Sequence, residues 1–79
     1  MLRPMLSLAK LQVGDSAEVV AVRGQGAIAV RLLEMGFVPG SKVSVVKAAP
    51  FGDPLELRVR GYHVSLRLAE AARVEVERR

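Results

Sequence analysis

Cysteine is absent from this 79-residue chain, and histidine occurs once, as His63. The lack of cysteine excludes disulfides, thiolate metal sites and a cysteine nucleophile. A single histidine excludes a metal centre built from two or three histidines of one chain. No apolar run approaches the roughly 20 residues that cross a bilayer, and the first residues lack the apolar stretch of a signal peptide. We therefore expect a cytoplasmic protein with no direct membrane insertion.

Aromatic residues and excess charge are also scarce. The chain has two Phe, one Tyr and no Trp, so the aromatic-lined groove that binds proline-rich peptides is not expected. The formal net charge is +4, but Arg3, Arg78 and Arg79 lie near the ends, and without these three the charge is +1. The basic balance therefore lies mostly in the tails, which weakens a nucleic-acid-binding interpretation.

The length allows one small domain. Apolar residues make up 51% of the chain, which argues against disorder. We expect a single domain over residues 1–79, with an ordered core at about 7–77 and loose tails at 1–6 and 78–79.

Alternation and β-branched residues predict five short strands. The clearest is Leu55–Arg60, where apolar and charged residues alternate strictly, as in a half-buried strand. Gly61 and Tyr62 are expected to turn the chain into a short partner strand that carries His63. The other expected strands are 17–22, 43–46 and 74–76.

The stretch from Ala27 to Met35 changes to a helical period. Ile28, Leu32 and Met35 are spaced as one buried stripe of a helix. Gly36 suits the left-handed position that follows a last helical turn. Shorter helical turns are expected near Leu8, and at 66–72 after Ser65 as N-cap.

Five short strands with little helix predict a small β-barrel, because a closed sheet has no exposed edges. Its unusual feature is the helix inserted between the first two long strands. A short C-terminal helical turn precedes the last strand. The fold class expected is thus mainly β.

Four blocks of the sequence resemble one protein family. Residues 31–40, Arg-Leu-Leu-Glu-Met-Gly-Phe-Val-Pro-Gly, are similar to the signature of the ferrous iron transport protein A (FeoA) family. Residues 49–54, Ala-Pro-Phe-Gly-Asp-Pro, resemble its central loop. Ser65-Leu66-Arg67 with Glu70-Ala71 resembles its C-terminal motif, and Leu8-x-x-Leu11-x-x-Gly14 also fits. The blocks run in order from about Leu8 to Val76, nearly the whole chain.

The resemblance implies an SH3-like barrel and a non-enzymatic accessory role in ferrous iron uptake. Members of this family are cytoplasmic partners of FeoB, a membrane transporter with a GTP-binding domain. We expect the inserted helix and the loop at 50–54 to contact the cytoplasmic part of FeoB and to alter its activity or assembly. Phe51 stands out, because a large apolar side chain in a Pro-Gly loop is hard to bury. The candidate partner-binding residues are Arg31, Met35, Phe37, Pro50, Phe51, Asp53 and Tyr62.

Metal binding and catalysis find little support in the residues. The candidate ligands His63, Asp53, Glu56 and Asp15 do not repeat at ligand spacing, so we expect no metal site and no cofactor, while weak metal binding stays open. The serines have one histidine to share as a base, and Gly24-Gln25-Gly26 lacks the rest of a phosphate-binding loop. We therefore expect no enzyme.

Two other functions stay open as alternatives. Small barrels bind nucleic acids through a basic face, and Arg58 and Arg60 share one strand face with Arg67 expected near. Glu56 in the same row favours an ordinary solvated face, and we expect no nucleic-acid partner. A peptide-binding module would dock apolar segments on a set of four residues, Met35, Phe37, Phe51 and Tyr62. Exposed strand edges would also allow a weak homo-oligomer.

Overall fold

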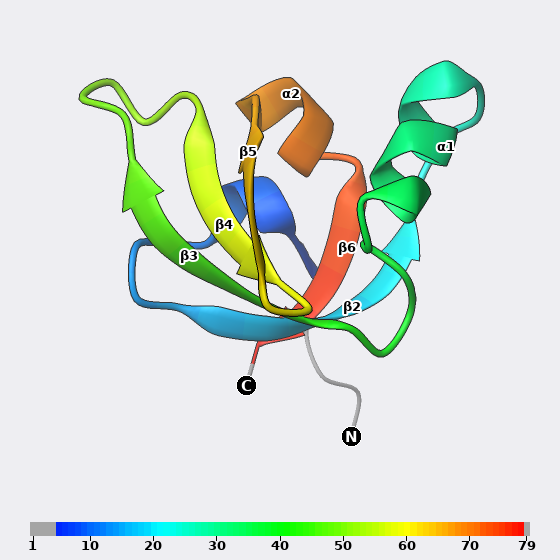
Figure 1. Cartoon of the computed structure of the whole chain (residues 1–79), viewed down its shortest axis with the longest axis horizontal. Coiled ribbons are helices and arrows are strands. Elements are labelled where there is room, and N and C mark those ends of the chain that lie inside the picture. Colours follow the sequence, from blue (N-terminus) through cyan, green and yellow to red (C-terminus); the bar gives the residue numbers. More distant parts are fainter. Residues whose placement is uncertain (1–4, 79) are drawn as a thin grey trace.

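A computed structural model describes residues 5–78 and shows one curled sheet of six antiparallel strands in the order β1-β6-β2-β3-β4-β5 (Figure 1). The strands are β1 (Met5–Ser7), β2 (Ser16–Val22), β3 (Lys42–Ala48), β4 (Leu55–Val59), β5 (Tyr62–Leu66) and β6 (Val74–Arg78). The helices are α1 (Ala27–Glu34), α2 (Leu68–Ala71) and the 3-10 turn η1 (Leu8–Lys10). The mainly β architecture with an inserted helix and a short C-terminal helix is as predicted.

The sheet has one strand more than the five expected. The extra strand is β1, in which Met5 pairs with Glu77 and Leu6 with Val76 of β6. Three residues are too few to show an alternation in the sequence, so Met5 and Leu6 were wrongly assigned to a loose tail. Arg78, also assigned to a tail, is the last residue of β6. Residues 1–4 and Arg79 of the expected tails lie outside the described residues.

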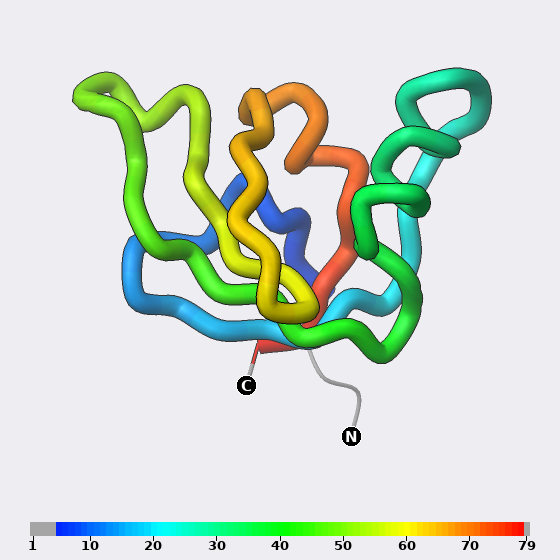
Figure 2. Tube along the Cα trace, viewed as in Figure 1, coloured from blue at the N-terminus to red at the C-terminus, as the bar shows by residue number. Residues whose placement is uncertain are grey.

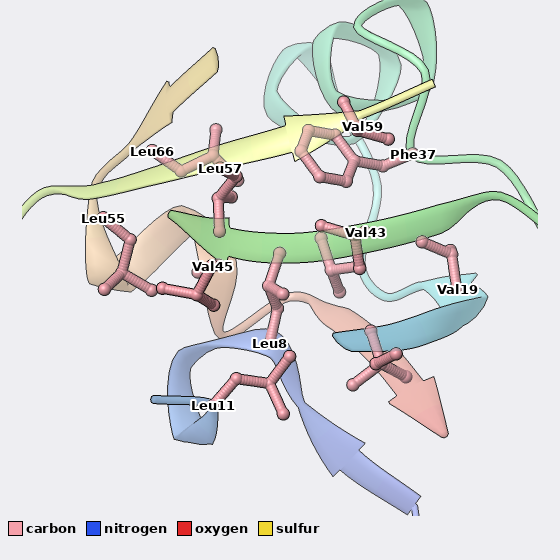
Figure 3. Close-up of a cluster of buried hydrophobic side chains, with 14 of the residues drawn as sticks. Leu8, Leu11, Val19, Phe37, Val43, Val45, Leu55, Leu57, Val59 and Leu66 are labelled. Carbon is pink, nitrogen blue, oxygen red and sulfur yellow. The ribbon is translucent and has the colours of Figure 1, made fainter. Parts of the chain in front are cut away.

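The inward faces of the strands and the helices enclose one apolar core (Figure 3). The Phe37 ring lies in it between Val43 and Val59, two residues that are paired across β3 and β4. No polar side chain within residues 5–78 is buried. The fully buried large side chains are Phe37, Leu8, Leu32, Leu57, Leu66, Val19, Val43, Val59, Val74 and Val76.

Helix α1 ends as the sequence predicts. Gly36 has a φ of +111°, in the range that favours glycine, and its N–H donates to the Leu33 carbonyl. The Phe37 N–H donates to the Leu32 carbonyl at 3.1 Å, which directs the ring back under the helix. The predicted stripe was partly wrong, because Ile28 is 40% exposed and Ala29 takes the buried position. The helix is apolar on several sides, so spacing alone did not fix its inward face.

The β4–β5 hairpin turns at the predicted place. Arg60 and Gly61 both have a positive φ, as the two central residues of a tight hairpin turn require. Ser65 was wrongly assigned as a helix cap, since it lies in β5 opposite Glu56. Helix α2 begins at Leu68 instead, and its N-cap is Arg67.

Candidate partner-binding surface

The loop between β3 and β4 presents the most exposed large apolar side chain of the described residues. Phe51 is 97% exposed at the tip of this loop. The loop backbone is held by hydrogen bonds from the Gly52 N–H to the Ala49 carbonyl at 2.7 Å and from the Ala49 N–H to the Pro54 carbonyl at 3.1 Å. An ordered loop that places a phenylalanine in water contributes nothing to the core, so this position suits contact with another molecule.

The loop is also fixed to the body of the protein by Asp53. Its Oδ1 atom accepts a hydrogen bond from the Leu68 N–H at 3.0 Å, at the start of α2. The same oxygen lies 3.9 Å from the guanidinium of Arg67. Asp53 therefore joins the loop to a helix that begins 15 residues further along the chain.

Helix α1 carries a second exposed apolar area. Its inner face buries Ala29 and Leu32, while Val30 is 53% and Leu33 42% exposed on the outside. Ile28, 40% exposed, lies on the other flank of the buried pair, so α1 carries exposed aliphatic side chains on both sides of its inner face, which was not predicted from the sequence. Arg31 and Glu34 lie on the outermost side of the helix.

Helix α2 lies between the loop and α1 and is bonded to both (Figure 1). On the loop side, the α2 backbone donates to Asp53. On the other side, Glu70 forms an ion pair with Arg31 of α1, and it also accepts a hydrogen bond from the Arg67 N–H at 3.0 Å. The loop 49–54, α2 and α1 therefore form one connected row along one side of the barrel, as Figure 2 also shows. We call this row the α1–loop surface.

The structure divides the predicted partner-binding residues. Four of them, Arg31, Pro50, Phe51 and Asp53, belong to the α1–loop surface. Met35 is half-buried at the end of α1, where it packs against the core.

Phe37 and Tyr62 do not belong to this surface. Phe37 is fully buried and its assignment to a contact surface was wrong, because the Gly36 turn folds its ring inward. Tyr62 is 71% exposed, but it follows the β4–β5 turn at the opposite end of β4 from the loop. A five-residue strand separates the two ends by roughly 13 Å.

Arg31 forms an ion pair with a residue that is distant in the sequence. Its guanidinium bonds to Glu70, 39 residues away. Its side chain is 58% exposed, and the pair links the inserted helix to α2. No local spacing could have revealed a pair that forms only when the sheet curls.

The candidate metal ligands are spread over the surface. Within residues 5–78, no group of three or more His, Asp or Glu side chains is arranged to hold a metal ion. His63 is exposed on the edge strand β5, where its Nε2 lies 2.9 Å from a guanidinium nitrogen of Arg58.

The basic residues considered for nucleic-acid binding do not form one group. Arg67 adjoins the loop 49–54, whereas Arg58 lies toward the other end of the hairpin. Over the described part of the chain, no helix has the length and apolar character needed to cross a membrane.

Comparison with known proteins identifies the family. The model of the FeoA domain matches residues 6–78. The chain belongs to the FeoA family. It is 47% identical, over 72 residues, to a fusion of Fe(2+) transport protein A with the Fe(2+) transporter FeoB from Porphyromonas gingivalis. The match covers 91% of this chain but 8% of the fusion protein. The sequence-based resemblance is therefore confirmed, and the family is one of ferrous iron transport.

Solved structures of the family have the same fold. FeoA from Stenotrophomonas maltophilia, crystallised with zinc and described as an SH3 domain protein, superposes with a TM-score of 0.82 at 39% identity. That match covers 91% of this chain and 89% of the other. The FeoA-like protein from Clostridium acetobutylicum superposes with a TM-score of 0.89 at 31% identity, covering 99% and 90% of the two chains. The SH3-like barrel implied by the resemblance is thus confirmed.

Proposed function

We propose that this protein is a non-enzymatic accessory factor of ferrous iron uptake that docks its α1–loop surface on the cytoplasmic, GTP-binding part of a FeoB-type transporter. The observation that carries the proposal is Phe51, 97% exposed on a loop held by its own hydrogen bonds and by α2. The existence of a relative in which FeoA and FeoB form one chain supports the choice of partner. A cytoplasmic location belongs to the same proposal.

Docking would work through a phenylalanine anchor at one end of the surface and exposed aliphatic side chains of α1 at the other. Burying one aromatic side chain on a partner contributes about 1.5–3 kcal/mol. Val30 and Leu33 of α1 add aliphatic contacts, and α2 between the loop and α1 sets the spacing. Because the loop is already ordered, little conformational entropy is lost when the partner binds.

Regulation then follows from differential binding. A partner alters the activity or assembly of a transporter only if it binds one state of that transporter more tightly than another. The two ends of the α1–loop surface suit this purpose, because a partner that changes shape can lose one contact while keeping the other. We expect the affinity to differ between the GDP-bound and GTP-bound forms of the transporter domain.

The decisive experiment measures binding to the isolated cytoplasmic domain of the cognate transporter, without nucleotide, with GDP and with a GTP analogue. Phe51→Ala is expected to weaken binding about tenfold or more, since it removes the anchor. Tyr62→Ala is the matched control, because it removes an exposed aromatic side chain from the opposite end of the hairpin. Equal losses of affinity in the two variants, or an affinity that neither variant lowers, would refute the α1–loop surface as the contact with the transporter. The absence of binding in every nucleotide state would refute the choice of partner domain.

A further inference from the structure

A basic hollow of about 470 Å³ opens on the outer face of the sheet, away from the α1–loop surface. Three cationic side chains line it, and no carboxylate is among the lining residues. Its residues come from β2, β3 and β4 and from the β4–β5 turn. They are Ser16, Ala17, Lys42, Val43, Ser44, Arg58, Arg60 and Gly61.

The strand register gathers the polar groups of this hollow. Ser16 pairs with Ser44 across β2 and β3, and Ser44 pairs with Arg58 across β3 and β4. Paired residues on antiparallel strands project from the same face, so the two short hydroxyls and the long guanidinium form one row. Val43 pairs with Val59 on the antiparallel strands. Their neighbours Lys42 and Arg60 therefore lie beside each other at the end of that row.

Among residues 5–78, the cations of the hollow take part in no ion pair. The four ion pairs between residues 5 and 78 involve Arg23, Arg31, Arg67 and Arg78. Arg58 instead contacts a ring nitrogen of His63, which brings no negative charge. Glu18 lies across from Lys42 in the register, yet it does not line the hollow. The concave surface therefore presents several positive charges to solvent.

Arg60 occupies a backbone conformation that does not suit it. Its φ is +52°, and it is the one non-glycine residue between 5 and 78 with a positive φ. Asn or Gly is preferred at this first position of a tight hairpin turn, and another residue costs about 1–2 kcal/mol there. The aliphatic stem of Arg60 lies over the turn at Gly36, where an added Cβ would be 3.4 Å from the Arg60 Cδ atom. This packing uses the stem but not the guanidinium, so a strained arginine at the rim of a hollow points to a function for its charged group.

We propose that this hollow binds the phosphate groups of a small polyanion. Two arginines supply the planar, forked donors that match phosphate oxygens, Lys42 adds a third charge, and the serine hydroxyls add hydrogen bonds. The volume is that of a small-molecule site, whereas a protein partner would cover a broader face. No aromatic side chain lines the hollow to stack on a nucleobase, so recognition is by phosphate and not by base. Inorganic tripolyphosphate and nucleoside triphosphates should therefore bind equally well.

The site is independent of the proposed transporter contact. The β4–β5 turn that contributes Arg60 and Gly61 lies at the far end of the hairpin from the loop that carries Phe51 (Figure 2). Loss of one surface by mutation should leave the other intact. A failure of the phosphate-binding test would thus not bear on transporter docking.

The test titrates the full chain with tripolyphosphate at low ionic strength, by calorimetry and by the amide chemical shifts of Ser16, Ser44 and Gly61. We expect a dissociation constant below about 1 mM. The double variant Arg58→Gln/Arg60→Gln should raise this constant about tenfold or more, because it removes two charge-assisted contacts. Arg67→Gln is the matched control, an exposed arginine outside the hollow, and should change the constant less than about twofold.

Comparison of several phosphate-bearing ligands identifies the source of the phosphate. Equal affinities for tripolyphosphate, ATP and GTP support a free polyphosphate ligand. Binding to phosphatidylglycerol vesicles, but not phosphatidylcholine vesicles, that needs Arg58 and Arg60 supports a lipid phosphate. The site is refuted by no binding to any phosphate probe, by equal losses in the arginine variants and the control, or by tighter binding to an oligonucleotide than to tripolyphosphate.

Discussion

Two phenylalanines, 14 positions apart, have opposite environments, and their replacement should have opposite effects. Phe37 is fully buried against the inner face of β3 and β4, and Phe51 is 97% exposed. Truncating a buried phenylalanine to alanine costs about 3–5 kcal/mol, from lost apolar burial and the cavity that remains. An exposed side chain without contacts costs less than about 0.5 kcal/mol.

The expected loss of folding stability in Phe37→Ala is large for a chain of this length. A 79-residue domain has a total stability of about 4–12 kcal/mol. With a urea m-value of roughly 1.2 kcal/mol/M, a loss of about 4 kcal/mol lowers the unfolding midpoint by about 3 M. Phe37→Leu keeps most of the volume and should cost less than about 1.5 kcal/mol, so it provides a folded variant in which the core is still perturbed.

Urea unfolding followed by far-ultraviolet circular dichroism suits the comparison, because the chain has no Trp to report by fluorescence. Transporter binding measured on the same proteins should give the reverse order, with Phe51→Ala defective and Phe37→Leu normal. The assignment of one ring to the core and the other to the surface would be refuted by either of two results of the urea experiment. One is a loss of unfolding free energy of more than about 1 kcal/mol for Phe51→Ala, and the other is a loss of less than about 1 kcal/mol for Phe37→Ala.

Three further substitutions test other features of the fold. Arg60→Asn should have a urea midpoint above that of Arg60→Ala by an amount equivalent to about 0.5–1 kcal/mol, because both variants lose the contact with Gly36 and Asn tolerates the left-handed conformation better; an equal or lower midpoint would contradict the strain inferred at the turn. Gly36→Ala should lower the melting temperature by roughly 4–12 °C, since a φ of +111° costs an L-residue about 1–2 kcal/mol; a wild-type melting curve would show that the turn can relax. Arg31→Ala should cost less than about 1 kcal/mol in the same unfolding assay, as expected for an exposed ion pair with Glu70, and at saturating concentration it should stimulate GTP hydrolysis by the transporter domain as much as the wild type does; loss of that stimulation at saturation would give Arg31 a direct role at the nucleotide.

Alternation of apolar and charged residues was enough to predict the β4–β5 hairpin. Charged residues between Leu55, Leu57 and Val59 allow one orientation of the strand, and Gly61 marks the turn. The Gly36 cap followed from sequence for a similar reason, because one residue type fits the left-handed conformation. The motifs at 31–40 and 49–54 also sufficed to identify the family, which the domain match over 6–78 confirms.

Tertiary structure decided everything that depends on long-range contacts. Strand β1 exists because β6 offers a free edge, and three residues carry no periodic signal of their own. The buried side of α1 follows from how the helix meets the sheet, since aliphatic residues surround all but the side that carries Arg31 and Glu34, and the sequence does not choose between Ile28 and Ala29 as the buried residue. Arg31 finds Glu70, and Asp53 finds the amide of Leu68, only once the curled sheet brings α2 between the loop and α1. Local sequence sets backbone conformation, but the assembly of a surface from distant segments is fixed by packing.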